Sequence, residues 1–104
     1  MNQNQNSNGY VPKVFDLSHI TLPAELEPLV EKLAEQVHET WSVGKMAQGF
    51  TFAEVSNPAE LKHHCLRPFS ELSDADAEYD RATAISTIKQ LLALGWKLTP
   101  PAEP

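Results

Sequence analysis

The side chains with the clearest chemical potential lie in the middle of the chain. His38, Trp41 and Lys45 recur at spacings of three and four, so they share one face if this stretch is helical. Two aromatic rings, Phe50 and Phe52, follow directly. Planar bases stack on aromatic rings, and phosphate groups bind Arg and Lys. The pattern therefore indicates a small pocket for a purine-like or other anionic ligand.

Three basic residues farther along the chain would supply positive charge to such a pocket. The predicted ligand-binding set is His38, Trp41, Lys45, Phe50, Phe52, Lys62, Arg67 and Arg81. These residues also have a purely structural interpretation, in which Trp41 and Phe52 belong to the core. In that case His38 bonds a backbone carbonyl and Arg81 pairs with a glutamate of the preceding helix. Both interpretations stay open.

A second cluster, His63-His64-Cys65, invites a metal-site interpretation. Adjacent residues are expected to point in divergent directions, however, and metal sites usually combine spaced pairs such as C-x₂-C or H-x₃-H. The other histidines, His19 and His38, are remote in sequence. We therefore expect no metal site and no cofactor, and we expect Cys65 to be a small buried apolar residue.

Catalytic motifs are absent from the sequence. It contains no Gly-rich phosphate loop and no G-x-S-x-G elbow, and its carboxylates fall on faces expected to contact water. We therefore expect a protein that is not an enzyme. Ser70 and Ser73 lie in an acidic context that some kinases accept, but Ser73 is also expected to cap a helix.

Two long amphipathic helices would position these side chains. The first is predicted over 22–50 and ends at Gly49; its apolar stripe is Leu26, Val30, Leu33, Val37 and Trp41, with Leu29 and Ala34 at the margins. Pro28 should distort its first part. The second is predicted over 74–94, from a capping box at Ser73 to Gly95, with Trp96 packed back on the helix. We predict a shared core of Leu33, Val37, Trp41, Ile85, Ile88 and Leu92.

The remaining segments are short. Residues 50–52 alternate like a strand, 58–63 suit one helical turn, and 66–69 should be extended and pair with 97–99 as a second strand. Residues 10–21 are predicted to form an extended arm that lies across the helices, anchored by Tyr10 and Phe15, with Asp16 and Ser18 fixing a turn. Residues 1–9 should be a disordered tail, and 99–104 a Pro-rich tail. The predicted fold class is mainly α: two long antiparallel amphipathic helices with a short β element and an extended N-terminal arm.

Composition narrows the setting. The chain has 104 residues and a formal net charge of −6, which disfavours binding to nucleic acid or to anionic membranes. Its one cysteine cannot form an internal disulfide, and its first residues contain no apolar signal segment. We expect a cytoplasmic location.

Four runs carry a family resemblance: LPAELEPLVEKLAEQVHETW, AQGFTF, KHHCLRPF and EYDRATAISTIKQLLALGW. Together they resemble the RyR domain, the repeat module of ryanodine receptors, over a domain of residues 10–98. The family favours Trp then Tyr where this chain has Phe50 and Phe52. It often has Gly at the position of Ala53 and Pro at that of His64.

The resemblance implies a non-catalytic regulatory or ligand-sensing module, because receptor modules regulate a calcium-release channel and one pair is linked to adenine-nucleotide binding. The expected ligand is nucleotide-like. The alternative is a protein-interaction or assembly module with no small-molecule site. Receptor modules occur as tandem pairs about a pseudo-two-fold axis, and both predicted apolar stripes are wide. We therefore expect a single copy to form a symmetric homodimer.

Overall fold

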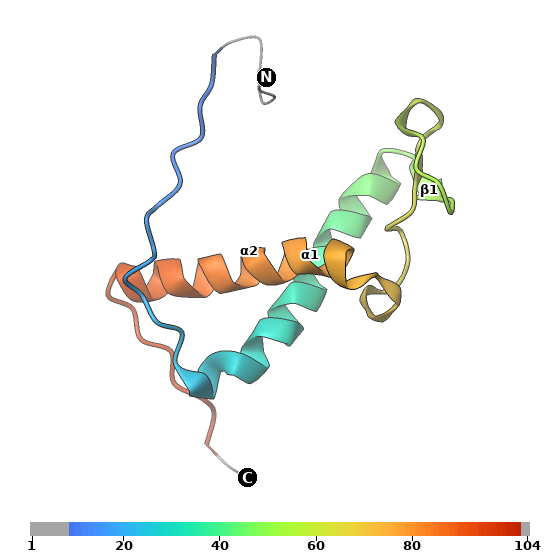
Figure 1. Cartoon of the computed structure of the whole chain (residues 1–104). Helices are drawn as coiled ribbons and strands as arrows, with labels where there is room; N and C mark the ends of the chain where they lie inside the picture. The colour runs from blue at the N-terminus through green and yellow to red at the C-terminus, as the bar shows by residue number, and fades with distance from the viewer. Residues whose placement is uncertain (1–8, 103–104) are drawn as a thin grey trace.

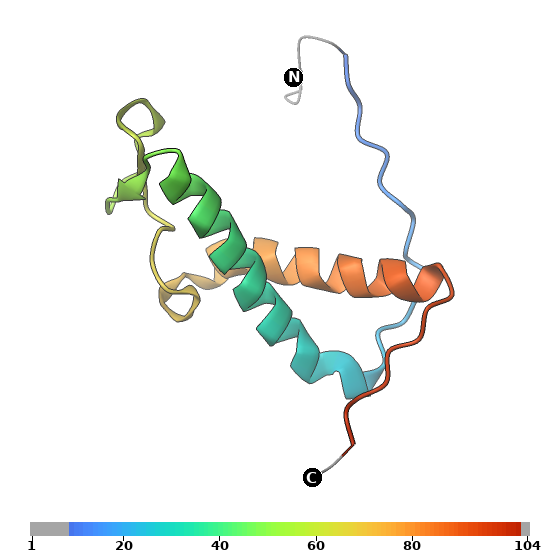
Figure 2. The same cartoon turned by 180° about the vertical axis from the view of Figure 1, so that it is seen from behind.

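Two helices dominate the structure and cross like the strokes of an X (Figure 1). The structure is a computed structural model that describes residues 9–102. Helix α1 spans Glu27–Ala47 after a short 3-10 turn, η1 (Ala24–Leu26), and α2 spans Asp74–Ala93. The helices run in opposite senses, and α1 passes in front of α2 when the molecule is seen from behind (Figure 2). The predicted mainly α fold, with two long helices and a short β element, is confirmed.

Local sequence explains where the helices begin and end. Pro28 lies in the first turn of α1, where a missing N–H costs no bond, so η1 precedes a regular helix and Pro28 distorts nothing beyond it. Gly49 and Gly95 both have a φ of +96°, as predicted for helix stops. After α2, the backbone N–H of Trp96 donates to the Leu91 carbonyl at 3.0 Å. Its side chain is 67% exposed, however, so the predicted packing of the Trp96 ring onto the helix is wrong.

Two strands of two residues each pair in parallel in the segment between α1 and α2, next to the C-terminal end of α1. Strand β1 (Thr51–Phe52) pairs with β2 (Lys62–His63), beyond the turn η2 (Pro58–Glu60). The chain reverses through Leu61, whose φ is +57°. The predicted pairing of 66–69 with 97–99 is wrong, because neither segment forms a strand and the sheet of the described residues consists of β1 and β2. The segment predicted to be extended over 66–69 runs instead into another 3-10 turn, η3 (Phe69–Glu71).

The core centres on small side chains at the crossing. Ala34 is 0% exposed and Ala84 2% exposed, although the sequence pattern placed Ala34 at the margin of its stripe. The ion pair Glu31–Arg81 and the contact of His38 Nδ1 with Asp80 Oδ2 at 3.8 Å link the helices near this point. The buried core cluster is Leu26, Val30, Ala34, Ala84 and Ile88. Small side chains let two helices approach closely, so the crossing is tight and the helices diverge away from it.

The predicted core was therefore only partly correct. Ile88 is fully buried, and Leu33, Ile85 and Leu92 are half-buried against the core cluster. Val37 and Trp41 are also half-buried but lie outside that cluster. They sit where the helices have already separated.

The N-terminal arm is extended, as predicted, but it is not anchored as predicted. Followed from η1 back toward the N-terminus, the arm passes the C-terminal end of α2 and then leads away from both helices (Figure 1). Phe15 is 56% exposed, and Leu22, just beyond the arm, packs against the core cluster. The predicted turn is present, since the Ser18 N–H donates to Asp16 Oδ1 at 3.0 Å. Tails were predicted at 1–9 and 99–104, and of these residues 1–8 and 103–104 lie outside the described part of the chain.

Candidate functional site

A hollow of about 490 Å³ opens between the C-terminal half of α1 and the N-terminal half of α2. We call it the hollow. It is lined by Val37, His38, Thr40, Trp41, Cys65, Leu72, Ala75, Asp76, Tyr79, Asp80 and Thr83. Its volume lies within the ~300–1,000 Å³ typical of small-molecule sites. The divergence of the helices beyond the crossing creates it.

The floor of the hollow is a buried histidine and aspartate. His38 is 2% exposed, and its Nε2 donates to the Arg67 carbonyl at 2.7 Å, which leaves Nδ1 facing the Asp80 carboxylate at 3.8 Å. Burial raises the pKa of Asp80, while His38 opposes this effect. The backbone bond made by His38 confirms the structural interpretation of this residue.

Aromatic rings form the walls. Trp41 stacks on His38 with ring centroids 5.6 Å apart and meets the edge of His63 at 4.7 Å. Tyr79, on α2, is 75% exposed at the rim. A flat ligand therefore has one partly buried ring and one accessible ring against which to stack.

The predicted ligand-binding residues do not form one site. His38 and Trp41 line the hollow, and the other six lie elsewhere. Lys45 lies over the Phe50 ring at 4.6 Å, Arg67 lies over the exposed Phe52 ring at 4.7 Å, and the Lys62 ammonium donates to Thr51 Oγ1 at 2.9 Å.

Arg81 is committed to other partners. Its Nε lies 2.6 Å from Glu31 Oε2, and its guanidinium lies over the Phe69 ring at 5.8 Å. The hydrogen bond to Glu31 raises the pKa of Arg81. This pairing is the one expected from the structural interpretation.

The electrostatics of the hollow are acidic. Asp76 and Asp80 both line it, and none of the described residues lining it is Lys or Arg. Arg67 lies instead at a smaller neighbouring cavity of about 250 Å³ that shares Asp76 with the hollow. The lining thus suits groups that donate hydrogen bonds better than it suits phosphate.

A family model described as the RyR domain matches residues 10–100. The chain belongs to the RyR domain family. The resemblance read from the four sequence runs is therefore confirmed. No helix in residues 9–102 of this RyR domain is long and apolar enough to cross a membrane.

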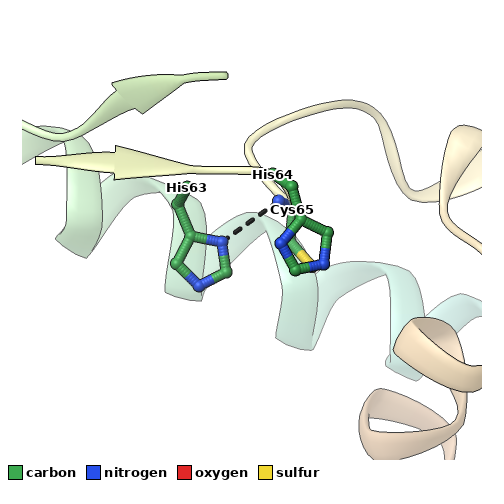
Figure 3. Close-up of side chains that lie close together, drawn as sticks. All are labelled: His63, His64 and Cys65. Carbon is green, nitrogen blue, oxygen red and sulfur yellow. Dashed lines mark hydrogen bonds between the residues drawn. The ribbon is translucent and has the colours of Figure 1, made fainter. Parts of the chain in front are cut away.

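Beside the hollow, the RyR domain holds the cluster His63-His64-Cys65 (Figure 3). One nitrogen or sulfur atom from each residue lies within 4.8 Å of the others, so the expected divergence of these side chains is wrong. The turn after β2 brings them together, because the Cys65 N–H donates back to His63 Nδ1 at 3.1 Å. Cys65 is half-buried, less than was predicted.

Charge at this cluster is set by neighbouring groups. Burial and the carboxylate of Asp76 raise the pKa of the Cys65 thiol to about 11. Burial opposes ionisation of Asp76, but hydrogen bonds from Ser73 and His64 lower its pKa overall. Burial and the neighbouring His64 lower the pKa of His63. A thiol with so high a pKa is a poor nucleophile at neutral pH.

Three residues that shape the RyR-domain hollow were missed from sequence: Asp76, Tyr79 and Asp80. Asp76 had been assigned only to the helix start. Tyr79 and Asp80 lie three and four residues beyond it, so all three occupy one face of α2. That spacing is the signal in the sequence that identifies this wall of the hollow.

Proposed function

We propose that this RyR domain is a non-catalytic ligand-sensing module, and that its hollow takes the planar part of a nucleotide-like molecule. The observation that carries the proposal is an aromatic-walled hollow of about 490 Å³ with carboxylates inside it. A base stacks against Trp41, and its amino N–H groups donate to Asp76 or Asp80.

On this proposal, the base of the ligand contributes more to binding than its phosphate groups do. Phosphate groups would be repelled by Asp76 and Asp80 and must leave the hollow toward basic side chains outside it, such as Arg67. The proposed specificity is therefore for the base. Nucleosides should bind at least as well as the corresponding nucleotides.

Thermal-shift titrations test this with adenosine, guanosine and their mono- and diphosphates. A ligand at 100 times its dissociation constant should stabilise the fold by ~2.7 kcal/mol. The chain has two tryptophans, so Trp96→Phe leaves Trp41 as a single fluorescent reporter in the hollow. A base that binds should quench it. Unchanged melting and fluorescence at millimolar concentrations of every compound would refute ligand sensing.

A second candidate function is assembly without a small-molecule site. The observation that favours it is a set of large apolar side chains exposed on the arm and after α2: Val11, Val14, Phe15, Leu94 and Trp96. On this proposal two copies pair through these side chains as a symmetric homodimer. Sedimentation equilibrium decides the matter, because a single 11.6 kDa species at ~100 μM contradicts stable pairing.

A cytoplasmic setting is part of the same proposal. Cys65 is the only cysteine of the chain, so the fold gains nothing from an oxidising compartment. Melting temperatures with and without a reducing agent should agree for the monomeric protein. A large difference between the two would contradict this setting.

A further inference from the structure

We propose that His64, Cys65 and Asp76 form a binding site for a zinc-type divalent transition-metal ion. The three side chains come from the turn after β2 and from the first turn of α2. His64 Nε2 lies 3.2 Å from Asp76 Oδ2 and 3.5 Å from Cys65 Sγ. One ring nitrogen is therefore the meeting point of an imidazole, a thiol and a carboxylate.

These separations fit tetrahedral coordination. Ligand atoms held ~2.0–2.3 Å from Zn²⁺ at tetrahedral angles are ~3.3–3.8 Å apart. Both distances from His64 Nε2 fall at or close to this interval. Helix α2 fixes the carboxylate, because the Asp76 N–H donates to the Ser73 hydroxyl at 3.1 Å.

A supporting contact orients the imidazole. Ser56 Oγ lies 2.7 Å from His64 Nδ1 and also accepts the His64 backbone N–H at 2.9 Å. A hydroxyl can donate or accept, so Ser56 satisfies either tautomer of the ring. When Ser56 accepts a hydrogen bond from Nδ1–H, Nε2 presents its lone pair to Asp76 and Cys65. Metal-binding histidines usually have such a partner on the second nitrogen.

The neighbouring His63 is excluded from this ligand set. Its ring stacks on that of His64 with an interplanar angle of 13° and centroids 5.3 Å apart. A metal ion lies close to the plane of each imidazole that binds it, so two nearly parallel stacked rings cannot share one ion. His63 Nδ1 is also already bonded to the Cys65 N–H. His63 therefore provides a matched control.

The donor types indicate the kind of ion. A thiolate, an imidazole and a carboxylate suit Zn²⁺ and its neighbours in the transition series, whereas Mg²⁺ and Ca²⁺ prefer oxygen ligands alone. The side chains of His64 and Asp76 are 41% and 33% exposed, so the ion can enter from solvent. Three protein ligands leave one position for water or another small ligand. An ion here ties the connection to α2 beside the hollow.

The test measures Zn²⁺ affinity of the full chain by competition with a chromophoric chelator, with no nucleotide present. We expect one ion per chain. His64→Ala and Cys65→Ser should each weaken binding by at least ~100-fold, and Ser56→Ala by ~10-fold. In the control His63→Asn, the side-chain carbonyl can still accept the Cys65 N–H that shapes the turn. The control Asp74→Asn changes an exposed carboxylate in the same helical turn as Asp76. Zinc affinity of both should stay within about threefold of the unchanged protein.

Co²⁺ provides an independent readout. Bound Co²⁺ should show a thiolate-to-metal charge-transfer band that disappears in Cys65→Ser, a near-isosteric change that keeps the fold. Zn²⁺ should also raise the melting temperature of the unchanged protein and leave that of Cys65→Ser unaltered. Zinc affinity that is the same in His64→Ala and Cys65→Ser as in the unchanged protein would overturn the proposal, as would a Co²⁺ complex without the band. Neither result bears on nucleotide binding in the hollow.

Discussion

The two sides of the helix crossing are completed in different ways. On the terminal side, formed by residues 26–34 of α1 and 84–92 of α2, Leu22 and Leu98 from the chain's end segments pack onto the core cluster. On the opposite side, the helices diverge around the hollow, where polar His38 and Asp80 are buried. Apolar side chains of the same chain fill the space between the helices on the terminal side, whereas the space on the opposite side, the hollow, stays accessible. The core and the proposed binding site thus lie at opposite ends of the same helix pair.

The largest effect should come from emptying the terminal side. Ile88→Ala should lower the free energy of unfolding by ~2–5 kcal/mol, because Ile88 is 1% exposed and its loss leaves a cavity. Urea denaturation measures the change. Val43→Ala, at a position of α1 that is 70% exposed, is the control and should cost less than ~0.5 kcal/mol. Equal costs at both positions would show that the terminal side is not the core.

Overfilling the crossing should have the next largest effect. Ala34→Leu should destabilise the fold by ~1–3 kcal/mol, because Ala34 is 0% exposed and the added atoms force the helices apart. Ala82→Leu, at an exposed position of α2, serves as the matched control in the same denaturation experiment. Tolerance of Leu at position 34 would mean that the helices do not approach closely there.

On the side of the hollow, the N-cap of α2 at Ser73 should contribute more to the free energy of unfolding than apolar packing does. Ser73→Ala removes the acceptor for the Asp76 N–H and should cost ~1 kcal/mol. Thermal unfolding of this variant beside Ser70→Ala, an exposed serine in the preceding turn, isolates the cap. A loss no greater than that of Ser70→Ala would remove the cap from the account of α2.

The smallest effect concerns Asp80 and depends on pH. Burial raises the pKa of Asp80 above its ordinary value of 3.8, so the folded state holds a proton that the unfolded state releases. The contribution of protonated Asp80 to the free energy of unfolding is therefore complete in acid and is lost as pH rises through the folded-state pKa of Asp80. Asp80→Asn cannot ionise and should gain in melting temperature relative to the unchanged protein over that interval.

The Asp80 comparison depends on the difference between the two proteins across pH. The other titratable groups near Asp80, namely His38, Asp76 and Cys65, are present in both proteins, and only their coupling to Asp80 differs between the two. A difference that stays constant from pH 3 to pH 7 would show that burial does not perturb Asp80.

Sequence patterns predicted the features that depend on local chemistry. The cap at Ser73, the glycine stops at Gly49 and Gly95 and the family itself follow from residues close together in the chain. The position of the helix crossing could not be predicted from such local patterns. An apolar stripe identifies a buried face, but it does not show at which residues two helices meet, and Ala34 and Ala84 carry little hydrophobic signal despite being central.

The site was predicted less well than the fold for a related reason. Helical spacing put His38, Trp41 and Lys45 on one face, but only the first two reach the hollow, because Lys45 lies past the point where α1 leaves α2. The opposite wall, with Asp76 and Asp80, depends on how α2 is placed against α1. The turn that brings His64 and Cys65 together depends on their backbone N–H groups, which donate to Ser56 Oγ and His63 Nδ1, and sequence spacing does not encode these bonds.

The tight crossing at Ala34 and Ala84 also makes the helix pair resemble a pair of scissors with its pivot near the middle. In scissors the angles on opposite sides of the pivot are equal, so blades and handles open together. The terminal side corresponds to the handles, and there Leu22 and Leu98 pack onto the core and hold the two helices at one spacing. A ligand that needed a wider gap between the blades would have to pull that apolar packing apart, so the filled end of the molecule sets the aperture of the empty one.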